Sequence, residues 1–240
     1  MAVTLLIPAL DEAKALPALV AHVAALDPQP AEVLLVDGGS GDETVAIARD
    51  AGWRVMTAGR GRARQINAGV EVARSELVCV LHADTEPPRD IVAEVERMLA
   101  DPEVALGGFT TILRGPDGVR RFTSFHNRIK TWYAPLLLRP HLYAKGVRLL
   151  FGDHAMHFRR ADYLAAGGCD PGTPVMEEAD LCIRMARFGR VRLNPRKIYT
   201  SDRRVAEWGE LKANWIYFKV GIMWAFGARA RLAQHYPDIR

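Results

Sequence analysis

The stretch VTLLIPALDE, residues 3–12, joins a continuous run of apolar and β-branched residues to an abrupt polar turn. A run of this kind is typical of a strand that is buried on both faces, as in a parallel sheet covered by helices. Residues 33–36 (VLLV) and 77–81 (LVCVL) repeat the pattern, and a polar turn again follows each of them. These three runs predict the centre of a parallel sheet.

Four helices are predicted around these strands, because apolar residues recur there at intervals of three and four. They are expected over residues 13–26, 43–51, 63–73 and 88–99, with a short additional strand over 54–56. The resulting βαβαβαβα order predicts an α/β, Rossmann-like, mostly parallel sheet with helices on both faces and a helical C-terminal tail. Right-handed crossovers then bring the loops that follow the strands to one edge of the sheet.

The order of elements changes after residue 102. The expected elements are a strand at 105–113, a turn at 115–118, one or two helices or a lid at 120–143, a strand at 153–158, a helix at 177–188 and a long helix at 207–233. We therefore expect a main domain, 1–206, followed by a C-terminal amphipathic helix, 207–240.

The composition limits the classes of function. The chain has 240 residues, of which 49% are hydrophobic, and this is enough for one substantial core. Its formal net charge of +4 suits a phosphate-bearing substrate or an anionic membrane surface, and predicts no nucleic-acid partner. Three cysteines without metal-ligand spacing, no signal peptide and no apolar stretch long enough to span a bilayer favour a cytoplasmic protein.

Polar and acidic residues follow three of the predicted strands. Glu12 follows the first strand, Asp37 begins the turn DGGSGDET after the second, and His82 and Asp84 follow the fourth. Residues two apart at a strand end point the same way, so His82 and Asp84 can face one ligand. Asp84 suits Mg²⁺ or Mn²⁺, and Asp37 suits a nucleobase or ribose. The structural alternative is that these carboxylates cap turns and helices.

Two charged segments lie at predicted helix starts. Residues 59–67 (GRGRARQIN) place three arginines where the helix dipole disfavours cations, so either a bound anion or a solvated basic face accounts for them. Residues 176–181 (MEEADL) place three carboxylates where the dipole favours them, which a structural role also explains. The functional alternative is a general base among Glu177, Glu178 and Asp180, since neighbouring carboxylates raise one another's pKa.

Together these motifs resemble the family 2 glycosyltransferases of the GT-A fold. The opening strand and loop, DGGSGDET, LHADT in the place of a metal-binding DxD motif and MEEADL in the place of an acidic base motif occur in that family's order. GRGRARQINAG, GDHAMHFRR and TSDRR are similar to a bacterial subfamily often labelled arsenosugar-biosynthesis-type or radical-SAM/selenodomain-associated transferases. His82 replaces the usual first aspartate, which leaves open whether it binds metal, ribose or neither.

The resemblance implies transfer of a sugar, with inversion, from a UDP-linked donor to an acceptor that the sequence does not identify. It implies that Asp84, with His82 as a candidate second ligand, holds the Mg²⁺ or Mn²⁺. Glu178 stands in the place of the catalytic base, with Glu177 the close second and Asp180 beside them. The implied donor-binding residues are Pro8, Leu10, Glu12, Asp37, Gly39, Arg62, Arg64, Asn67, His82, Arg203 and Arg204. Asp153 and His154 are candidates for the acceptor side, although a buried structural histidine equally explains His154.

The predicted C-terminal helix carries an apolar stripe. Its members are Leu211, Trp215, Phe218, Ile222 and Phe226, with basic residues beside them. One interpretation is a helix packed on the domain. The other is an interfacial helix through which the protein makes peripheral contact with anionic lipid at the inner membrane face.

Two rival functions share the expected fold and ligands. A nucleotidyltransferase that makes nucleotide sugars is expected to carry a glycine-rich phosphate loop followed by lysine near the N-terminus, and residues 8–14 lack this pattern. A non-catalytic nucleotide-sugar binder needs no acidic cluster such as the one at 177–180. The sequence therefore favours the transferase.

Overall fold

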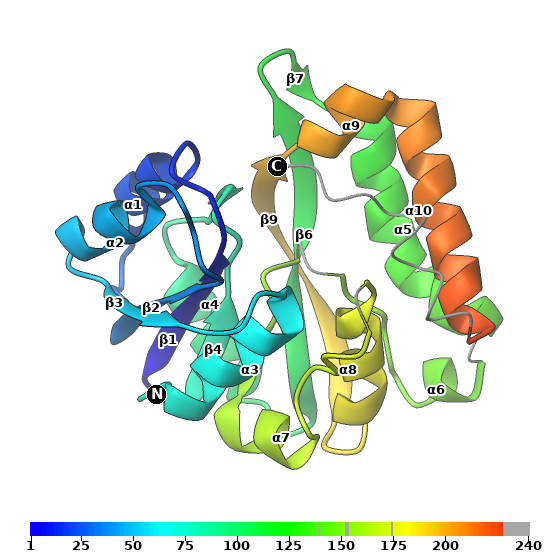
Figure 1. The fold of residues 1–240 in the computed structure, drawn as a ribbon. Helices are drawn as coiled ribbons and strands as arrows, with labels where there is room; N and C mark the ends of the chain where they lie inside the picture. Colours follow the sequence, from blue (N-terminus) through cyan, green and yellow to red (C-terminus); the bar gives the residue numbers. More distant parts are fainter. Residues whose placement is uncertain (139, 152–153, 174, 228–240) are drawn as a thin grey trace.

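The computed structural model describes residues 1–138, 140–151, 154–173 and 175–227 (Figure 1). Its first elements are β1 (Val3–Ala9), α1 (Leu16–Ala24), β2 (Glu32–Asp37), α2 (Thr44–Asp50), β3 (Arg54–Thr57), α3 (Arg62–Val72), β4 (Leu77–Val80), β5 (Thr85–Glu86) and α4 (Ile91–Leu99). The following elements are β6 (Val104–Gly115), β7 (Gly118–Val119), α5 (Arg121–Leu138), α6 (Pro140–Ala144), β8 (His157–Arg159), α7 (Arg160–Ala165), α8 (Glu177–Met185), β9 (Arg190–Ser201), α9 (Arg203–Trp208) and α10 (Glu210–Ala225). None of the helices within these ranges has the length and apolar content that crossing a bilayer requires.

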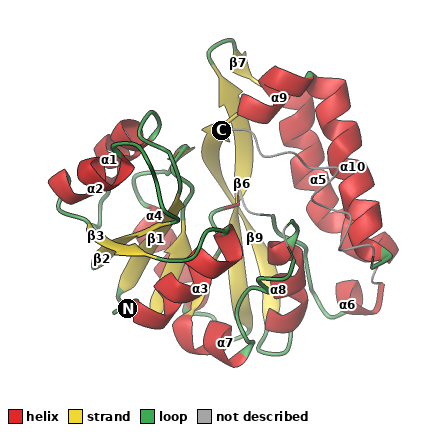
Figure 2. Ribbon diagram, viewed as in Figure 1, coloured by secondary structure: helices red, strands yellow, loops and turns green. Residues whose placement is uncertain are grey.

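The strands form one mixed sheet (Figure 2). Their order is β3-β2-β1-β4-β8-β6-β9-β5, and β7 pairs with β6. β1 is parallel to β2 and β4, and β9 is parallel to β6, whereas β8 is antiparallel to both of its neighbours. The chain moves from β1 outward to β3 and then returns to the other side of β1 at β4. Such a reversal of strand order is where open α/β sheets form a ligand crevice at the carboxyl ends of their strands.

Side chains of β1 alternate between two apolar clusters, as the period of two along a strand requires. Leu6 belongs to one cluster with Ile66 and Val70 of α3. Leu5 and Ile7 belong to the other, which includes residues of α1 and α4. β1 is therefore covered by helices on both faces, as its continuous apolar sequence predicts.

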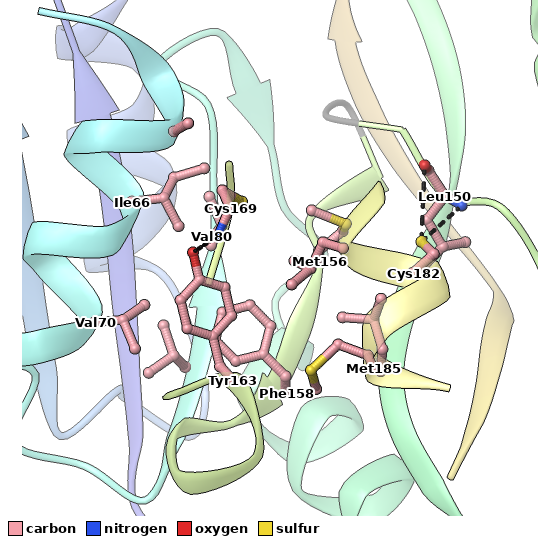
Figure 3. Close-up of a cluster of buried hydrophobic side chains, with 14 of the residues drawn as sticks. Ile66, Val70, Val80, Leu150, Met156, Phe158, Tyr163, Cys169, Cys182 and Met185 are labelled. Carbon is pink, nitrogen blue, oxygen red and sulfur yellow. Dashed lines mark hydrogen bonds between the residues drawn. The ribbon is translucent and has the colours of Figure 1, made fainter. Parts of the chain in front are cut away.

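The cluster on the α3 side extends to β8 and to helices α7 and α8 (Figure 3). The ring of Tyr163 stacks on Phe158 with 4.4 Å between ring centroids. The Cys182 sulfur lies 3.3 Å from the backbone nitrogen of Leu150, which donates to it. All three cysteines of the chain, Cys79, Cys169 and Cys182, are buried and free.

Two predicted elements have different limits. The strand expected over 153–158 begins only at His157, because Ala155 has a φ of +45° that an extended strand does not allow; residue 153 lies outside the described residues. The helix expected over 207–233 is divided into α9 and α10 at Gly209, whose φ of +79° ends one helix and starts the next. The part of that prediction beyond residue 227 lies outside the described residues.

Two features of the second half were not predicted. Pro135 lies inside α5, although proline usually ends or kinks a helix. Strand β9 was not predicted, because its charged residues and Pro195 hide the alternation of a strand. The structure accommodates Pro195 at a register shift, where Phe109 and Thr110 of β6 pair with Asn194 and Lys197.

Close packing of α3 on the sheet can be tested at Gly69. A Cβ atom there would lie 2.5 Å from Leu6 Cδ1 and 2.8 Å from Val36 Cγ2, so Gly69→Ala should lower the free energy of unfolding by about 1–3 kcal/mol. Gly221 of α10 is the matched control, since a Cβ there meets nothing within 4 Å and alanine favours a helix. Denaturant unfolding of both variants measures the difference, and equal stabilities would contradict the packing described.

Candidate active site

The loops that follow β1 and β2 are held together by side chains of the second loop. The backbone N–H of Asp11 donates to Ser40 Oγ at 2.9 Å, and the Asp11 carboxylate accepts from the backbone of Gly41 at 2.8 Å. The backbone N–H of Glu12 donates to Thr44 Oγ1 at 2.8 Å. These bonds fix the backbone of residues 8–12 at the carboxyl edge of the sheet.

Asp37 organises its own turn. Its carboxylate accepts hydrogen bonds from the backbone of Gly39 at 3.0 Å and from Ser40 Oγ at 2.6 Å, and the side chain is buried. Gly39 has a φ of +95°, a conformation that favours glycine. Neither Asp37 nor Gly39 is among the residues that line the adjacent cavity. Contact of Asp37 with a nucleobase therefore stays a prediction.

Gln65 is a site residue that sequence analysis missed. Its side-chain Nε2 donates to the backbone oxygens of Ala9 at 2.7 Å and Val36 at 2.8 Å, so it joins the ends of β1 and β2. It lies on the buried side of α3, where a polar residue needs such partners. In the sequence, Gln65 is the one amide among the apolar positions of α3, and this was the available sign of a buried polar contact. The arginines on either side of it gave a stronger sign of a ligand site.

A cavity of about 620 Å³ opens at the carboxyl edge of β1 and β4. The predicted site residues that line it are Pro8, Leu10, Glu12, Arg62, His82, Asp84, Glu177, Glu178, Arg203 and Arg204. The predicted site residues that do not line it are Asp37, Gly39, Arg64, Asn67, His154 and Asp180. Asp153 lies outside the described residues. The volume of the cavity is within the range of ordinary ligand sites.

Asp84 forms one wall of the cavity and is paired with an arginine. Arg203 Nη2 lies 2.8 Å from Asp84 Oδ2, and the same guanidinium lies 3.3 Å from the Glu12 carboxylate. Burial opposes the charge of Arg203, but Asp84 and Glu12 outweigh it and raise the pKa of the guanidinium. Two carboxylates from separate strand ends thus converge on one cation. A divalent metal with phosphate oxygens is chemically suited to the same carboxylate.

His82 lies beside this pair and is uncharged at neutral pH. Burial lowers the pKa of its imidazole well below the ordinary value, and the charges of Arg62, Arg204 and Arg203 lower it further. The three arginines place positive charge on the side of the cavity next to His82, and this side suits an anion such as a diphosphate.

Glu177 and Glu178 lie side by side at the first turn of α8, and both are buried. Arg62 Nη1 lies 3.3 Å from Glu178 Oε1 and 3.9 Å from Glu177 Oε1. Burial and the charge of Glu178 raise the pKa of Glu177 to about 8, against the opposing effect of Arg62. The pair therefore holds one proton near neutral pH and can act as a proton acceptor on the cavity wall.

Four other predicted site residues have structural contacts. Asp180 accepts a hydrogen bond from the indole nitrogen of Trp224 at 3.2 Å, which joins α8 to α10. The Asn67 side chain donates to the backbone oxygen of Cys169 at 2.8 Å, and the exposed Arg64 points to the backbone oxygen of Arg60 at 3.4 Å.

His154, the fourth of them, is fully buried. Its Nδ1 lies 3.0 Å from the backbone oxygen of Phe109 in β6. The direct donor, acceptor and catalytic roles implied for Asp180, Asn67, Arg64 and His154 stay predictions.

Helices α5 and α10 supply a wall that sequence analysis did not assign to the site. The ammonium of Lys130 lies 4.0 Å from the ring centre of Phe151 and 5.3 Å from that of Tyr217. A hydrogen bond joins the two helices, since Nδ1 of His126 in α5 lies 2.6 Å from Oδ1 of Asn214 in α10. The aromatic and basic character of 120–143 was the available signal, but it did not indicate which face turns inward.

A divalent metal has one good carboxylate ligand here. Across the described residues, no three His, Cys, Asp or Glu side chains gather as a ready-made metal site. Mg²⁺ is commonly held by one or two carboxylates together with substrate phosphates, and Asp84 with Glu12 beside it fits that donor set. The residues present are therefore compatible with a metal that arrives with a diphosphate.

Comparison with known proteins decides the family. The model of "Glycosyl transferase family 2" matches residues 4–165. The chain belongs to glycosyl transferase family 2. It is 30% identical over 142 residues to the undecaprenyl-phosphate 4-deoxy-4-formamido-L-arabinose transferase of Aeromonas hydrophila, a match that covers 55% of this chain and 39% of the relative. The match thus spans about two fifths of that curated relative's length.

Solved structures of glycosyltransferases share the fold. Glucosyl-3-phosphoglycerate synthase from Mycobacterium tuberculosis, solved with Mn²⁺, UDP and its product, has a TM-score of 0.65 and 18% identity over 93% of this chain and 79% of that chain. A mannosyltransferase from Pyrobaculum calidifontis, solved with GDP-Man and Mn²⁺, has a TM-score of 0.69 and 20% identity over 95% and 64% of the two chains. The expected GT-A α/β fold and the family 2 glycosyltransferase are confirmed.

The raised pKa of Glu177 predicts a specific dependence of stability on pH. Between its ordinary pKa of 4.5 and about 8, the folded state holds a proton that the unfolded state has lost, so the free energy of unfolding falls as pH rises through this window. Glu177→Gln removes this ionisation. The variant should therefore gain stability relative to the native protein between pH 5 and pH 8.5, by up to about 4 kcal/mol.

Calorimetry at both pH values measures this gain. The exposed residue Glu207 offers a control, and Glu207→Gln should give the same difference from the native protein at the two pH values. A Glu177→Gln variant whose relative stability stays constant or falls with pH would contradict the assignment of a shared proton.

Proposed function

We propose that this family 2 glycosyltransferase moves a sugar from a nucleoside-diphosphate sugar, with UDP as the nucleotide, to an acceptor by one inverting displacement. The observation that carries the proposal is the arrangement of Asp84, three arginines and the Glu177–Glu178 pair around one cavity. The structural neighbours solved with UDP and Mn²⁺ or with GDP-Man and Mn²⁺ support a nucleotide-sugar donor and a divalent metal.

The positive side of the cavity is suited to the leaving group. Asp84 would hold Mg²⁺ or Mn²⁺, and when bound this ion would help neutralise the charge on the departing nucleoside diphosphate. Arg62, Arg203 and Arg204 face the same space and supply fixed positive charge. Since fixed charge aimed at developing charge is usually the largest catalytic contribution, these residues account for activation of the donor. Arg203 has to leave Asp84 when the metal is held there.

The carboxylate pair is suited to activation of the acceptor. Glu178 is proposed as the general base that takes the proton of the attacking hydroxyl, and Glu177 is the alternative within the same pair. Glu177, whose pKa is raised to about 8, lies beside Glu178 on the cavity wall and carries a proton near neutral pH. Arg62 orients the pair through its contact with Glu178, and Asp180 is proposed to position α8 from behind through Trp224.

Two variants separate the proposed roles. Asp84→Ala should reduce both sugar transfer and slow hydrolysis of the donor by at least about a hundredfold, because the seat of the metal is lost. Glu178→Gln should lower kcat by about 10²–10⁴ and leave the affinity for the donor within about twofold, because only proton transfer is affected. Steady-state kinetics and titration calorimetry with Mn²⁺ and the donor measure the two effects. If donor binding were lost equally in both variants, the assignment of roles would be wrong.

The same assay tests the rival functions. Incubation with Mn²⁺ and a series of nucleotide sugars should release nucleoside diphosphate slowly in the absence of an acceptor. Exchange of pyrophosphate into the nucleotide sugar would instead identify a nucleotidyltransferase, and tight donor binding without release would identify a binding protein.

Several narrower proposals accompany this function. We infer membership of the arsenosugar-biosynthesis-type or radical-SAM/selenodomain-associated subfamily from its motifs, a boundary between a domain of residues 1–206 and a C-terminal segment of 207–240, and a cytoplasmic location. We also propose peripheral contact of the present chain with a membrane; undecaprenyl phosphate stands in the name of the curated relative.

A further inference from the structure

Helices α5 and α10 run side by side (Figure 1), and apolar side chains of both are exposed. The two helices are parallel, because Thr123 contacts Glu210 near their starts and Lys130 contacts Tyr217 further along. The exposed apolar residues of the face are Phe122, Phe125, Ile129, Trp132 and Leu136 of α5, together with Leu211, Trp215 and Phe218 of α10 and Phe226 directly after it. We call these nine residues the α5–α10 face. Contiguous exposed apolar surface of this kind marks an interaction site.

Helical geometry places both stripes on the same side of the pair. At about 100° per residue, Phe122, Phe125 and Ile129 lie roughly a quarter turn from the residues of α5 that contact α10. Leu211, Trp215 and Phe218 lie a quarter turn from the residues of α10 that contact α5, in the opposite rotational sense. Because the helices are parallel and the two offsets have opposite sense, the exposed residues of α5 and those of α10 lie on the same outer side of the pair. This differs from the expectation of a single helix packed by its stripe, because Trp215 is 64% exposed and Leu211 82% exposed.

The charges beside the face are all positive. Arg121 and Arg128 lie along its edge on α5, and Lys212 and Lys219 along its edge on α10, and all four are exposed. The only acidic residue of the two helices is Glu210, whose carboxylate accepts hydrogen bonds from Thr123. An apolar surface bordered by cations on both sides matches the acyl region and the anionic headgroups of a lipid leaflet. A second copy of the chain fits poorly, since its four cations would face these four across the contact.

We propose that the α5–α10 face is a docking surface for an anionic lipid bilayer. The proposal rests on the peripheral membrane contact proposed above, to which it assigns a surface, and it does not depend on the identity of the donor. The inner sides of the same helices line the cavity, and Phe218 belongs to both the face and the cavity wall. Docking through this face therefore holds the cavity close to the membrane surface, where an acceptor carried by the membrane is reached directly.

Co-sedimentation of the full chain with vesicles tests the proposal. Vesicles of phosphatidylcholine with about 30% phosphatidylglycerol should bind the protein, vesicles of phosphatidylcholine alone should bind it far less, and added salt should weaken binding. Trp132→Glu combined with Trp215→Glu should weaken binding at least about tenfold, because each change places a charge in the apolar surface. Leu164→Glu is the matched control, since Leu164 is 41% exposed on α7 and should leave binding unchanged.

Fluorescence gives a second readout that a folding defect does not imitate. Anionic vesicles with brominated acyl chains should quench the tryptophan emission of the native protein. Trp132→Phe combined with Trp215→Phe keeps an apolar face and should still bind the vesicles, but with most of the quenching lost. Three outcomes would overturn the proposal: no binding of the native protein to anionic vesicles, undiminished binding of the double glutamate variant, or a dimer in solution that this variant dissociates.

Discussion

The structure depends on one constraint, the burial of β1 between two apolar clusters. Leu6 points to one cluster and Leu5 and Ile7 to the other, so a slip of the strand by one residue would move all three into the cluster on the opposite face. With β1 fixed, its parallel neighbours β2 and β4 end at the same edge of the sheet. The polar loops at that edge can then hold charges at defined separations, which is the condition for a specific ligand site on this fold.

The site combines groups that are unstable in isolation. Two buried carboxylates in contact repel each other, and three arginines around His82 repel each other as well. The positive and negative charges compensate each other in part, since Arg62 lies close to both carboxylates of the Glu177–Glu178 pair. Perturbed pKa values of this kind are typical of catalytic sites.

Much of the fold was predictable, because the buried parallel strands have uninterrupted apolar sequences. The cavity residues at strand ends were predictable for the same reason, since a polar residue such as Asp84 after an apolar run marks the edge of the sheet. Strand β9 was not predictable, because Pro195 and its charged neighbours conceal the pattern. Nor were Gln65, Lys130 and the outward turn of Trp215, because each depends on contacts between segments far apart in the chain.

The most direct test of the account is the position of a bound metal. Crystals grown or soaked with Mn²⁺ and UDP should give an anomalous scattering peak beside the Asp84 carboxylate, with the nucleotide in the same cavity. The account predicts that Arg203 has left Asp84 and contacts the diphosphate. A peak remote from Asp84, or a nucleotide bound outside the cavity while Arg203 keeps its contacts with Asp84 and Glu12, would contradict it.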